Sequence, residues 1–140
     1  TYFPAIRLLE PVKSYDEALT IHRVLSDAWI AHPDLTGVYN IGAGNDGLIE
    51  WVSGITPMTR PIMIIHELLP TSRTALEAGL IDAVIDQKPN EAIGEALRIM
   101  RLMVDVQPLV QDTHLITPAI YLCENLPTVS TKNSSHLKIG

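Results

Sequence analysis

The sequence predicts an α/β fold in which a mostly parallel sheet has helices on both faces. Short apolar runs of strand length alternate along the chain with stretches whose apolar residues recur at helical spacing. Short turns join these stretches, as in βαβ units. With 140 residues, of which 46% are hydrophobic, the chain is long enough to bury the core of one domain, or of one lobe of a larger protein.

The alternation begins at the start of the chain. An apolar run at 4–9 predicts a strand almost at the first residue, which suggests a fragment of something longer. Residues 14–17 form a capping-box pattern ahead of an apolar stripe at helical spacing. This helix should end near Pro33, because proline disfavours helical geometry in the residue before it. A strand at 37–41 and a short helix at 46–52 follow.

The rest of the chain continues the same alternation. We predict a strand at 61–66, a helix at 72–78, a strand at 81–85, a helix beginning at 89 and a strand near 118–122. Thr71 can cap the first of these helices, and Gly79 is placed to end it. Residues 125–140 are mostly polar and predict an irregular tail.

Polar side chains follow three of the predicted strands. Asn45 and Asp46 come after one strand, His66 and Glu67 after the next, and Gln87 after the third. Right-handed crossovers put these ends on one edge of a parallel sheet, where open α/β sheets bind small molecules. The sequence therefore predicts a small-molecule pocket at this edge. Helix capping by the first two pairs, and simple solvation of Gln87, are the alternative interpretations.

The segment from Gly42 to Gly47 also matches the dinucleotide fingerprint G-x-G-x-x-G, with Glu67 at the right distance to bind a ribose. Two observations argue against this interpretation. The following helix is too short for the usual crossover helix, and Asp46 would place a carboxylate beside a diphosphate. A nicotinamide- or flavin-dependent oxidoreductase remains an alternative on the sequence alone.

Composition argues against two further classes of function, nucleic-acid binding and membrane binding. A formal net charge of -6, with no basic cluster, argues against binding of nucleic acid or of an anionic membrane by this chain itself. No apolar run approaches the roughly 20 residues that span a bilayer. We therefore expect any DNA contact to come from elsewhere, and we expect no membrane partner.

No catalytic or metal-binding pattern stands out. The run His66-Glu67 begins like the zinc motif H-E-x-x-H, but position 70 is proline. Ser53 lacks the first glycine of G-x-S-x-G, and the spacing of the five histidines supports no metal cluster. The single cysteine, Cys123, predicts a buried and inert thiol rather than a disulfide. We therefore predict a non-enzyme with no metal and no cofactor.

Two long segments carry a family resemblance. The segments are PDLTGVYNIGAGNDGLIEWV and, after it, RPIMIIHELLPTSRTALEAGLIDAVIDQKPNEAIGEAL. They resemble the C-terminal lobe of the effector-binding domain of LacI/GalR-type transcriptional regulators. That domain is related to periplasmic sugar-binding proteins. The similarity covers about residues 1–103 in order, and 123–127 resembles the last strand of the domain.

The resemblance implies a two-lobed, periplasmic-binding-protein-like type I fold that clamps a small molecule, commonly a sugar, between its lobes. Asn45 and Glu67 match positions that hydrogen-bond sugar hydroxyls in the family, and Tyr15 lies near one that supplies an aromatic platform in some members. Ile65 replaces a glycine common in the family and is followed by His66, so the sugar is unusual or the ligand is another compound. Asp46 and Gln87 complete the expected ligand-binding set.

The family also implies a cytoplasmic homodimer that binds operator DNA through an N-terminal helix-turn-helix, which this chain lacks. On this basis, residues 1–105 form the C-terminal lobe, 106–127 the crossover and return strand, and 128–140 an irregular tail. The alternatives are a lobe of a periplasmic sugar-binding protein of a transporter and the dinucleotide-dependent oxidoreductase.

Overall fold

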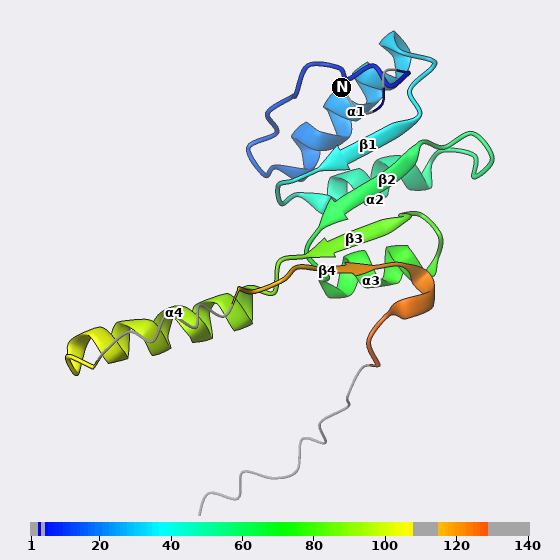
Figure 1. Ribbon diagram of the computed structural model, residues 1–140. Coiled ribbons are helices and arrows are strands. Elements are labelled where there is room, and N and C mark those ends of the chain that lie inside the picture. Colours follow the sequence, from blue (N-terminus) through cyan, green and yellow to red (C-terminus); the bar gives the residue numbers. More distant parts are fainter. Residues whose placement is uncertain (1–2, 4, 108–114, 129–140) are drawn as a thin grey trace, which may run out of the picture.

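A computed structural model describes residues 3, 5–107 and 115–128 (Figure 1). Its centre is a four-stranded sheet in the order β1-β2-β3-β4. The strands are β1 (Gly37–Asn40), β2 (Ile62–His66), β3 (Ala83–Asp86) and β4 (Ala119–Tyr121). The first three run parallel, and β4 pairs antiparallel with β3. The predicted α/β class and mostly parallel sheet are confirmed.

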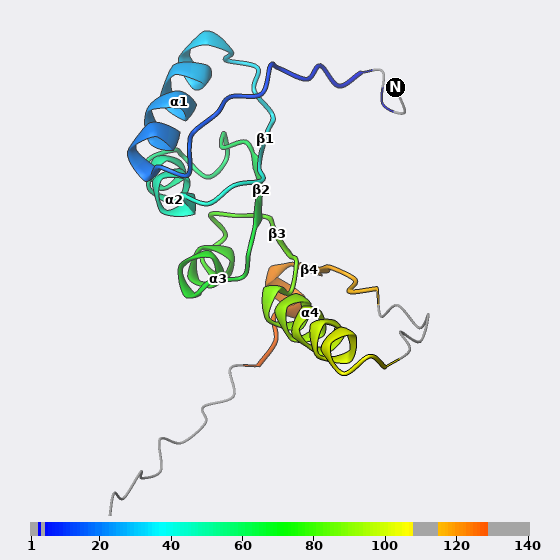
Figure 2. The same ribbon diagram turned by 90° about the vertical axis from the view of Figure 1, so that its left-hand side faces the viewer.

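Helices cover the sheet unevenly. The helices are α1 (Ala18–Ala31), α2 (Asn45–Ser53), α3 (Pro70–Glu77), α4 (Pro89–Val104) and the short 3-10 helix η1 (Cys123–Asn125). Figure 2 shows α1, α2 and α3 together on one side of the sheet. In Figure 1, α4 extends past the edge where the parallel strands end, instead of lying along the sheet.

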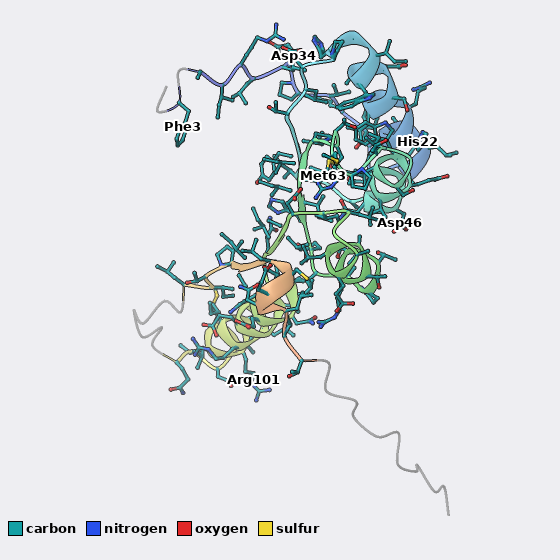
Figure 3. The ribbon with its side chains drawn as sticks, turned by 90° about the vertical axis from the view of Figure 1, so that its right-hand side faces the viewer. Phe3, His22, Asp34, Asp46, Met63 and Arg101 are labelled. Atoms are coloured by element: carbon teal, nitrogen blue, oxygen red, sulfur yellow. The ribbon has the colours of Figure 1, made fainter. Side chains whose placement is uncertain are left out.

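The core lies between the sheet and the first three helices. Alternation along β2 turns Met63 and Ile65 into this core, where both are fully buried, while Ile62 faces the other side and is exposed. In Figure 3, Met63 lies between the sheet and α2. Trp29 and Trp51 pack edge to face with ring centroids 5.9 Å apart, which joins α1 to α2.

An ion pair joins β2 and β3 at their amino ends. The two terminal guanidinium nitrogens of Arg60, Nη1 and Nη2, donate to the Asp82 carboxylate, at 2.7 and 2.8 Å. One Asp82 oxygen also accepts from the Met63 amide at 2.7 Å. The hydrogen bonds from Arg60 hold the pKa of Asp82 below its ordinary value, although partial burial opposes the shift.

The predicted strand at 4–9 is wrong for the residues described there. Residues 5–9 follow an irregular path and pair with no strand, and Ile6 and Leu8 are exposed. Apolar residues favour a strand only where a neighbouring strand accepts the backbone hydrogen bonds, and among the described residues β1 has its partner on one side only, in β2. In this segment the side chain of Arg7 forms an ion pair with Asp34, at 3.4 Å.

The predicted capping box at 14–17 is also wrong. Helix α1 begins at Ala18 without a side-chain cap, and the backbones of Tyr15 and Asp16 are left-handed, with φ of 53° and 61°. The reason is a contact distant in sequence, because the Asp16 carboxylate accepts a hydrogen bond from the Ala43 amide at 2.8 Å.

Helix α3 begins one residue before its predicted cap. Pro70 is its first residue, where a missing N–H costs nothing, so Thr71 is inside the helix and caps nothing. The hydroxyl of Ser72 instead accepts from the Leu69 amide at 2.8 Å and donates to the Glu67 carbonyl at 2.7 Å. The remaining helix and strand predictions agree with the structure within about two residues.

Three other expectations have different outcomes. Cys123 is exposed in η1, so the prediction of a buried thiol is wrong. None of the helices in the described part of the chain combines the length and apolar character that crossing a bilayer requires. The division at 105 and 127 stays a prediction, and residues 129–140 of the predicted tail lie outside the described residues, as do 108–114 of the predicted crossover.

Helix α4 has a continuous apolar face and no buried residue. The exposed apolar residues on this helix are Ile93, Leu97, Met100, Met103 and Val104. Since isolated helices of this length are marginal in water, packing against another surface has to stabilise such a face. The described residues supply no such surface.

Candidate ligand-binding site

The parallel strands end together, as the sequence predicts. Strands β1, β2 and β3 stop at Asn40, His66 and Asp86, and their carboxyl ends lie on one edge of the sheet (Figure 1). Asn45, Glu67 and Gln87 follow these ends directly or within a few residues. The expected shared edge is confirmed, while contact with a ligand stays a prediction.

His66 is the centre of this edge. Its side chain lies within a hydrogen-bond network, and the residue is only 7% exposed. The Tyr39 hydroxyl lies 2.8 Å from Nε2, and the amide nitrogen of Gln87 lies 2.9 Å from Nδ1. One imidazole therefore joins side chains from the ends of β1, β2 and β3. With both ring nitrogens engaged, His66 orients its neighbours.

Asn45 is buried next to the same edge and stabilises it through hydrogen bonds. It is 6% exposed. Its side-chain oxygen accepts a hydrogen bond from the side-chain amide of Asn40 at 2.8 Å, and its side-chain nitrogen donates to the His66 backbone carbonyl at 3.0 Å. The alternative that Asn45 caps α2 is wrong, since Gly44 occupies the cap position and no side chain caps the helix. Asn45 thus fixes the end of β2 relative to the start of α2.

Glu67 has the most unusual backbone at the edge. Its φ is 71°, a left-handed conformation that costs a non-glycine residue on the order of 1 kcal/mol. Three hydrogen bonds to its backbone hold it there: its amide donates to the Ile85 carbonyl, and its carbonyl accepts from the Leu69 amide and from the Ser72 hydroxyl. Its carboxylate makes no hydrogen bond or ion pair within the described part of the chain. The fold therefore holds, at the strand end, a carboxylate that no described residue pairs with.

The glycines of the fingerprint segment leave room for residues at the start of α1 and just before it, which pack closely against this loop. A Cβ at Gly47 would overlap the backbone of Ala18, and one at Gly42 would lie 2.6 Å from the Asp16 carboxylate. Gly44 has φ of 77° and packs against Ile21. Because the start of α1 fills the space beside this loop, the glycine spacing is explained without a nucleotide. This weighs against the dinucleotide interpretation.

Tyr15 and Asp46 lie outside the hydrogen-bond network of His66. Tyr15 is 80% exposed and directly precedes Asp16, which is bonded to Ala43. Asp46 is exposed in the first turn of α2, on the helix-covered side of the sheet (Figure 3). It borders an apolar groove of about 510 Å³ that residues of α2 and α3 line. Both stay predicted ligand residues that no described contact ties to the edge.

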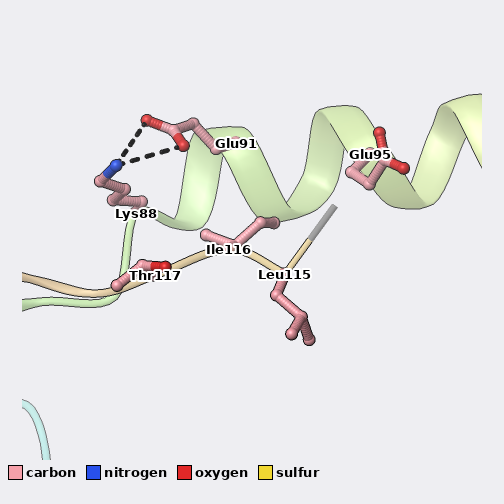
Figure 4. A pocket seen from close by; sticks show the side chains of 6 residues that line it. All are labelled: Lys88, Glu91, Glu95, Leu115, Ile116 and Thr117. Atoms are coloured by element: carbon pink, nitrogen blue, oxygen red, sulfur yellow. Dashed lines mark hydrogen bonds and ion pairs between the residues drawn. The ribbon is translucent and has the colours of Figure 1, made fainter. Parts of the chain in front are cut away.

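A second hollow adjoins the edge where α4 begins. It has a volume of about 340 Å³ and lies between the first turns of α4 and residues 115–117 (Figure 4). Lys88, whose backbone is left-handed with φ of 53°, lines it and pairs with Glu91 at 3.4 Å. The remaining lining is Glu95, Leu115, Ile116 and Thr117.

Sequence reasoning missed three residues that build this edge, namely Asp16, Tyr39 and Asn40. Asn40 donates to both Gly42 and Asn45, at 3.0 and 2.8 Å. The signal for Tyr39 is the strand register, which pairs it with Ile64 and places it on the same sheet face as His66. No three His, Cys, Asp or Glu side chains of the described residues group as metal ligands.

Several solved structures are similar to this chain. The chain is similar to GanP, a glucose-galactose binding protein from Geobacillus stearothermophilus, with a TM-score of 0.73 and 20% identity over 83% of this chain and 41% of that one. It is also similar to a chain of the XylFII–LytSN complex, with a TM-score of 0.75 and 16% identity over 86% of this chain and 42% of that one.

A third similar structure is an ABC transporter solute-binding protein from Burkholderia graminis in complex with D-arabinose. The TM-score is 0.73, with 17% identity over 89% of this chain and 44% of that one. The chain has the fold of a lobe of a periplasmic-binding-protein-like protein. It spans less than half the length of each of these three proteins. No protein-family model matches the sequence, and no curated protein matches it either.

Proposed function

We propose that this periplasmic-binding-protein-like lobe binds a sugar or similar polyhydroxy compound as the effector of a bacterial LacI-type transcriptional regulator. In this proposal the protein is a cytoplasmic homodimer without catalytic activity. It binds operator DNA through a domain outside this chain. The ligand binds between the carboxyl edge described here and a second lobe.

The observation that carries the proposal is the Glu67 carboxylate, which has no hydrogen-bond or ion-pair partner among the residues that the structure describes. The backbone of Glu67 is held in a costly conformation by three hydrogen bonds, next to the His66 network. Such conformations cluster at binding sites. A carboxylate offers several acceptor positions, and the hydroxyls of a sugar are suitable donors. The comparison adds that GanP is a glucose-galactose binding protein and that the Burkholderia protein was solved with D-arabinose.

Calorimetric titration of the full-length protein with D-glucose, D-galactose and D-arabinose tests the proposal. We expect saturable binding of at least one sugar at micromolar affinity or tighter, with the others weaker because their hydroxyls meet the edge differently. Binding of none of the three, by protein whose circular dichroism shows it folded, would count against sugar recognition.

The transporter alternative has a specific observation in its favour, since one similar structure is an ABC transporter solute-binding protein. The upstream coding sequence separates the two functions. A helix-turn-helix supports the regulator, and a signal peptide supports the transporter protein. A gel-shift assay in which the bound sugar changes affinity for promoter DNA would then establish regulation directly.

We expect no catalysis at this edge. The oxidoreductase alternative requires dinucleotide binding at the glycine loop, where the Ala43 amide already donates to Asp16. Mixing NADH with the protein should leave the cofactor fluorescence unchanged, and the bound sugar should be recovered chemically unaltered. Enhanced NADH fluorescence, or turnover of the sugar, would contradict a purely binding function.

A further inference from the structure

The hydroxyl of Tyr39 reaches the binding edge although its backbone does not. Tyr39 pairs with Ile64 across the sheet, so His66 is two residues nearer to the carboxyl end, about 6 to 7 Å along the strand. The hydroxyl nevertheless lies 2.8 Å from Nε2 of His66. The phenol ring therefore extends toward the edge along the sheet face opposite to α1, α2 and α3, and the residue is 56% exposed.

The network determines where the hydroxyl proton points. An amide nitrogen can only donate, so the Gln87 side chain donates to Nδ1 of His66, which therefore has no proton. A neutral imidazole then has its proton on Nε2 and donates it to the Tyr39 oxygen. The phenol accepts this bond, which leaves its own O–H free to donate away from His66.

We propose that Tyr39 is a further ligand-contacting residue, which donates its O–H to an acceptor oxygen of the bound compound, and that His66 is the positioning residue that aims it. This inference rests on the proposed function and deepens it. Tyr39 supplies a donor and Glu67 supplies an acceptor at neighbouring strand ends. That combination suits a neutral compound with adjacent hydroxyls, because each hydroxyl both accepts and donates.

The first test removes only the hydroxyl. In the full-length protein, Tyr39→Phe should weaken binding of the tightest of D-glucose, D-galactose and D-arabinose by about three- to tenfold, as expected for one neutral hydrogen bond. Tyr121→Phe is the matched control, because Tyr121 lies on β4 and packs against the core on the helix-covered side. The control should bind like the unaltered protein.

The second test separates positioning from mere structure. In His66→Gln, the amide nitrogen takes the place of Nε2 and can still donate to Tyr39, so affinity should stay within about twofold. His66→Asn is too short to reach Tyr39 and should weaken binding about as much as Tyr39→Phe. The double variant Tyr39→Phe/His66→Asn should bind no more weakly than either single variant, because both changes remove one shared interaction.

The outcomes distinguish this inference from the function on which it rests. If the unaltered protein binds none of the three sugars, both are overturned. If it binds a sugar and folded Tyr39→Phe binds equally well, the role of Tyr39 alone is overturned. If the two His66 variants weaken binding equally, or the double variant shows additive losses, His66 does not act through Tyr39.

Discussion

At the scale of single residues, the side chains at the carboxyl edge are of two kinds. Some form hydrogen bonds within the protein, and others have no partner among the described residues. Asn45 and His66 are buried and use their side-chain atoms on other parts of the protein. Glu67 differs, because its backbone is fixed by hydrogen bonds while its carboxylate is unpaired among the described residues. We therefore expect Glu67 to recognise the ligand, while ligand contact by Asn45, whose side chain supports the edge, stays a prediction.

The strain at Glu67 leads to a prediction about stability and binding. Glycine adopts a left-handed backbone without steric cost, so Glu67→Gly should leave the free energy of unfolding unchanged or raise it by up to about 1 kcal/mol. The same change should weaken sugar binding at least about tenfold, because it removes a charged acceptor. Urea unfolding and calorimetry of the full-length protein measure the two effects.

Glu50→Gly is the matched control for this prediction. Glu50 lies within α2, where glycine costs about 1 kcal/mol, so the control should be less stable but should keep its affinity. If Glu67→Gly were clearly destabilising, the left-handed backbone would not be a site of strain.

At the scale of helices and strands, apolar periodicity predicted the order of the helices and the parallel strands. It also predicted that Asn45, Glu67 and Gln87 follow strand ends on one edge. These features follow from local spacing and from the handedness of crossovers. The contribution of Tyr39 depends on the register between β1 and β2, and a single sequence does not encode that register locally.

The errors have the same origin. The apolar run at 4–9 resembles a strand in composition, but no described strand pairs with residues 5–9. The polar residues ahead of α1 form a capping-box pattern, yet Asp16 bonds to Ala43, which is 27 positions away. The lack of a distant strand partner decided the first outcome, and a contact distant in sequence decided the second.

The ion pair between β2 and β3 gives a prediction for pH. The folded-state pKa of Asp82 is lowered from 3.8, so its contribution to stability is full above about that value and is lost as pH falls through the lower folded pKa. At pH 7, Asp82→Asn should lower the free energy of unfolding by about 1 kcal/mol, a modest value because Asp82 is 35% exposed to screening solvent.

Urea titrations at pH 7 and near pH 3 check this. The difference between the unaltered protein and Asp82→Asn should shrink at the lower pH. Glu77→Gln breaks the more exposed pair with Arg73 and should change stability little at either pH. A difference that grows on acidification would show that the pair does not stabilise the fold.

At the scale of the whole molecule, the exposed face of α4 indicates a missing partner surface. The chain covers less than half of each of the three similar proteins, so we expect a second lobe, as in the proposed function, to cover this face in the full-length protein. Expressed alone, the chain should self-associate through α4 and bind sugar poorly.

Sedimentation velocity at tens of micromolar measures the self-association. Leu97→Glu places a charge in the middle of the apolar face and should shift the isolated chain toward the monomer. Leu19→Glu is the control, because Leu19 is exposed on α1, and it should leave the association unchanged. A strictly monomeric chain that also binds a sugar tightly would mean that no second lobe is required.

The central claim is that the full-length protein binds its ligand at the carboxyl edge through Glu67. Calorimetric titration of Glu67→Ala with the tightest-binding of the three sugars tests it most directly, with Glu10→Ala as a control for loss of an exposed charge. We predict that affinity falls at least about tenfold in Glu67→Ala, because a hydrogen bond to a charged group is lost, and that Glu10→Ala binds normally. Unchanged affinity in folded Glu67→Ala would contradict this account of the site.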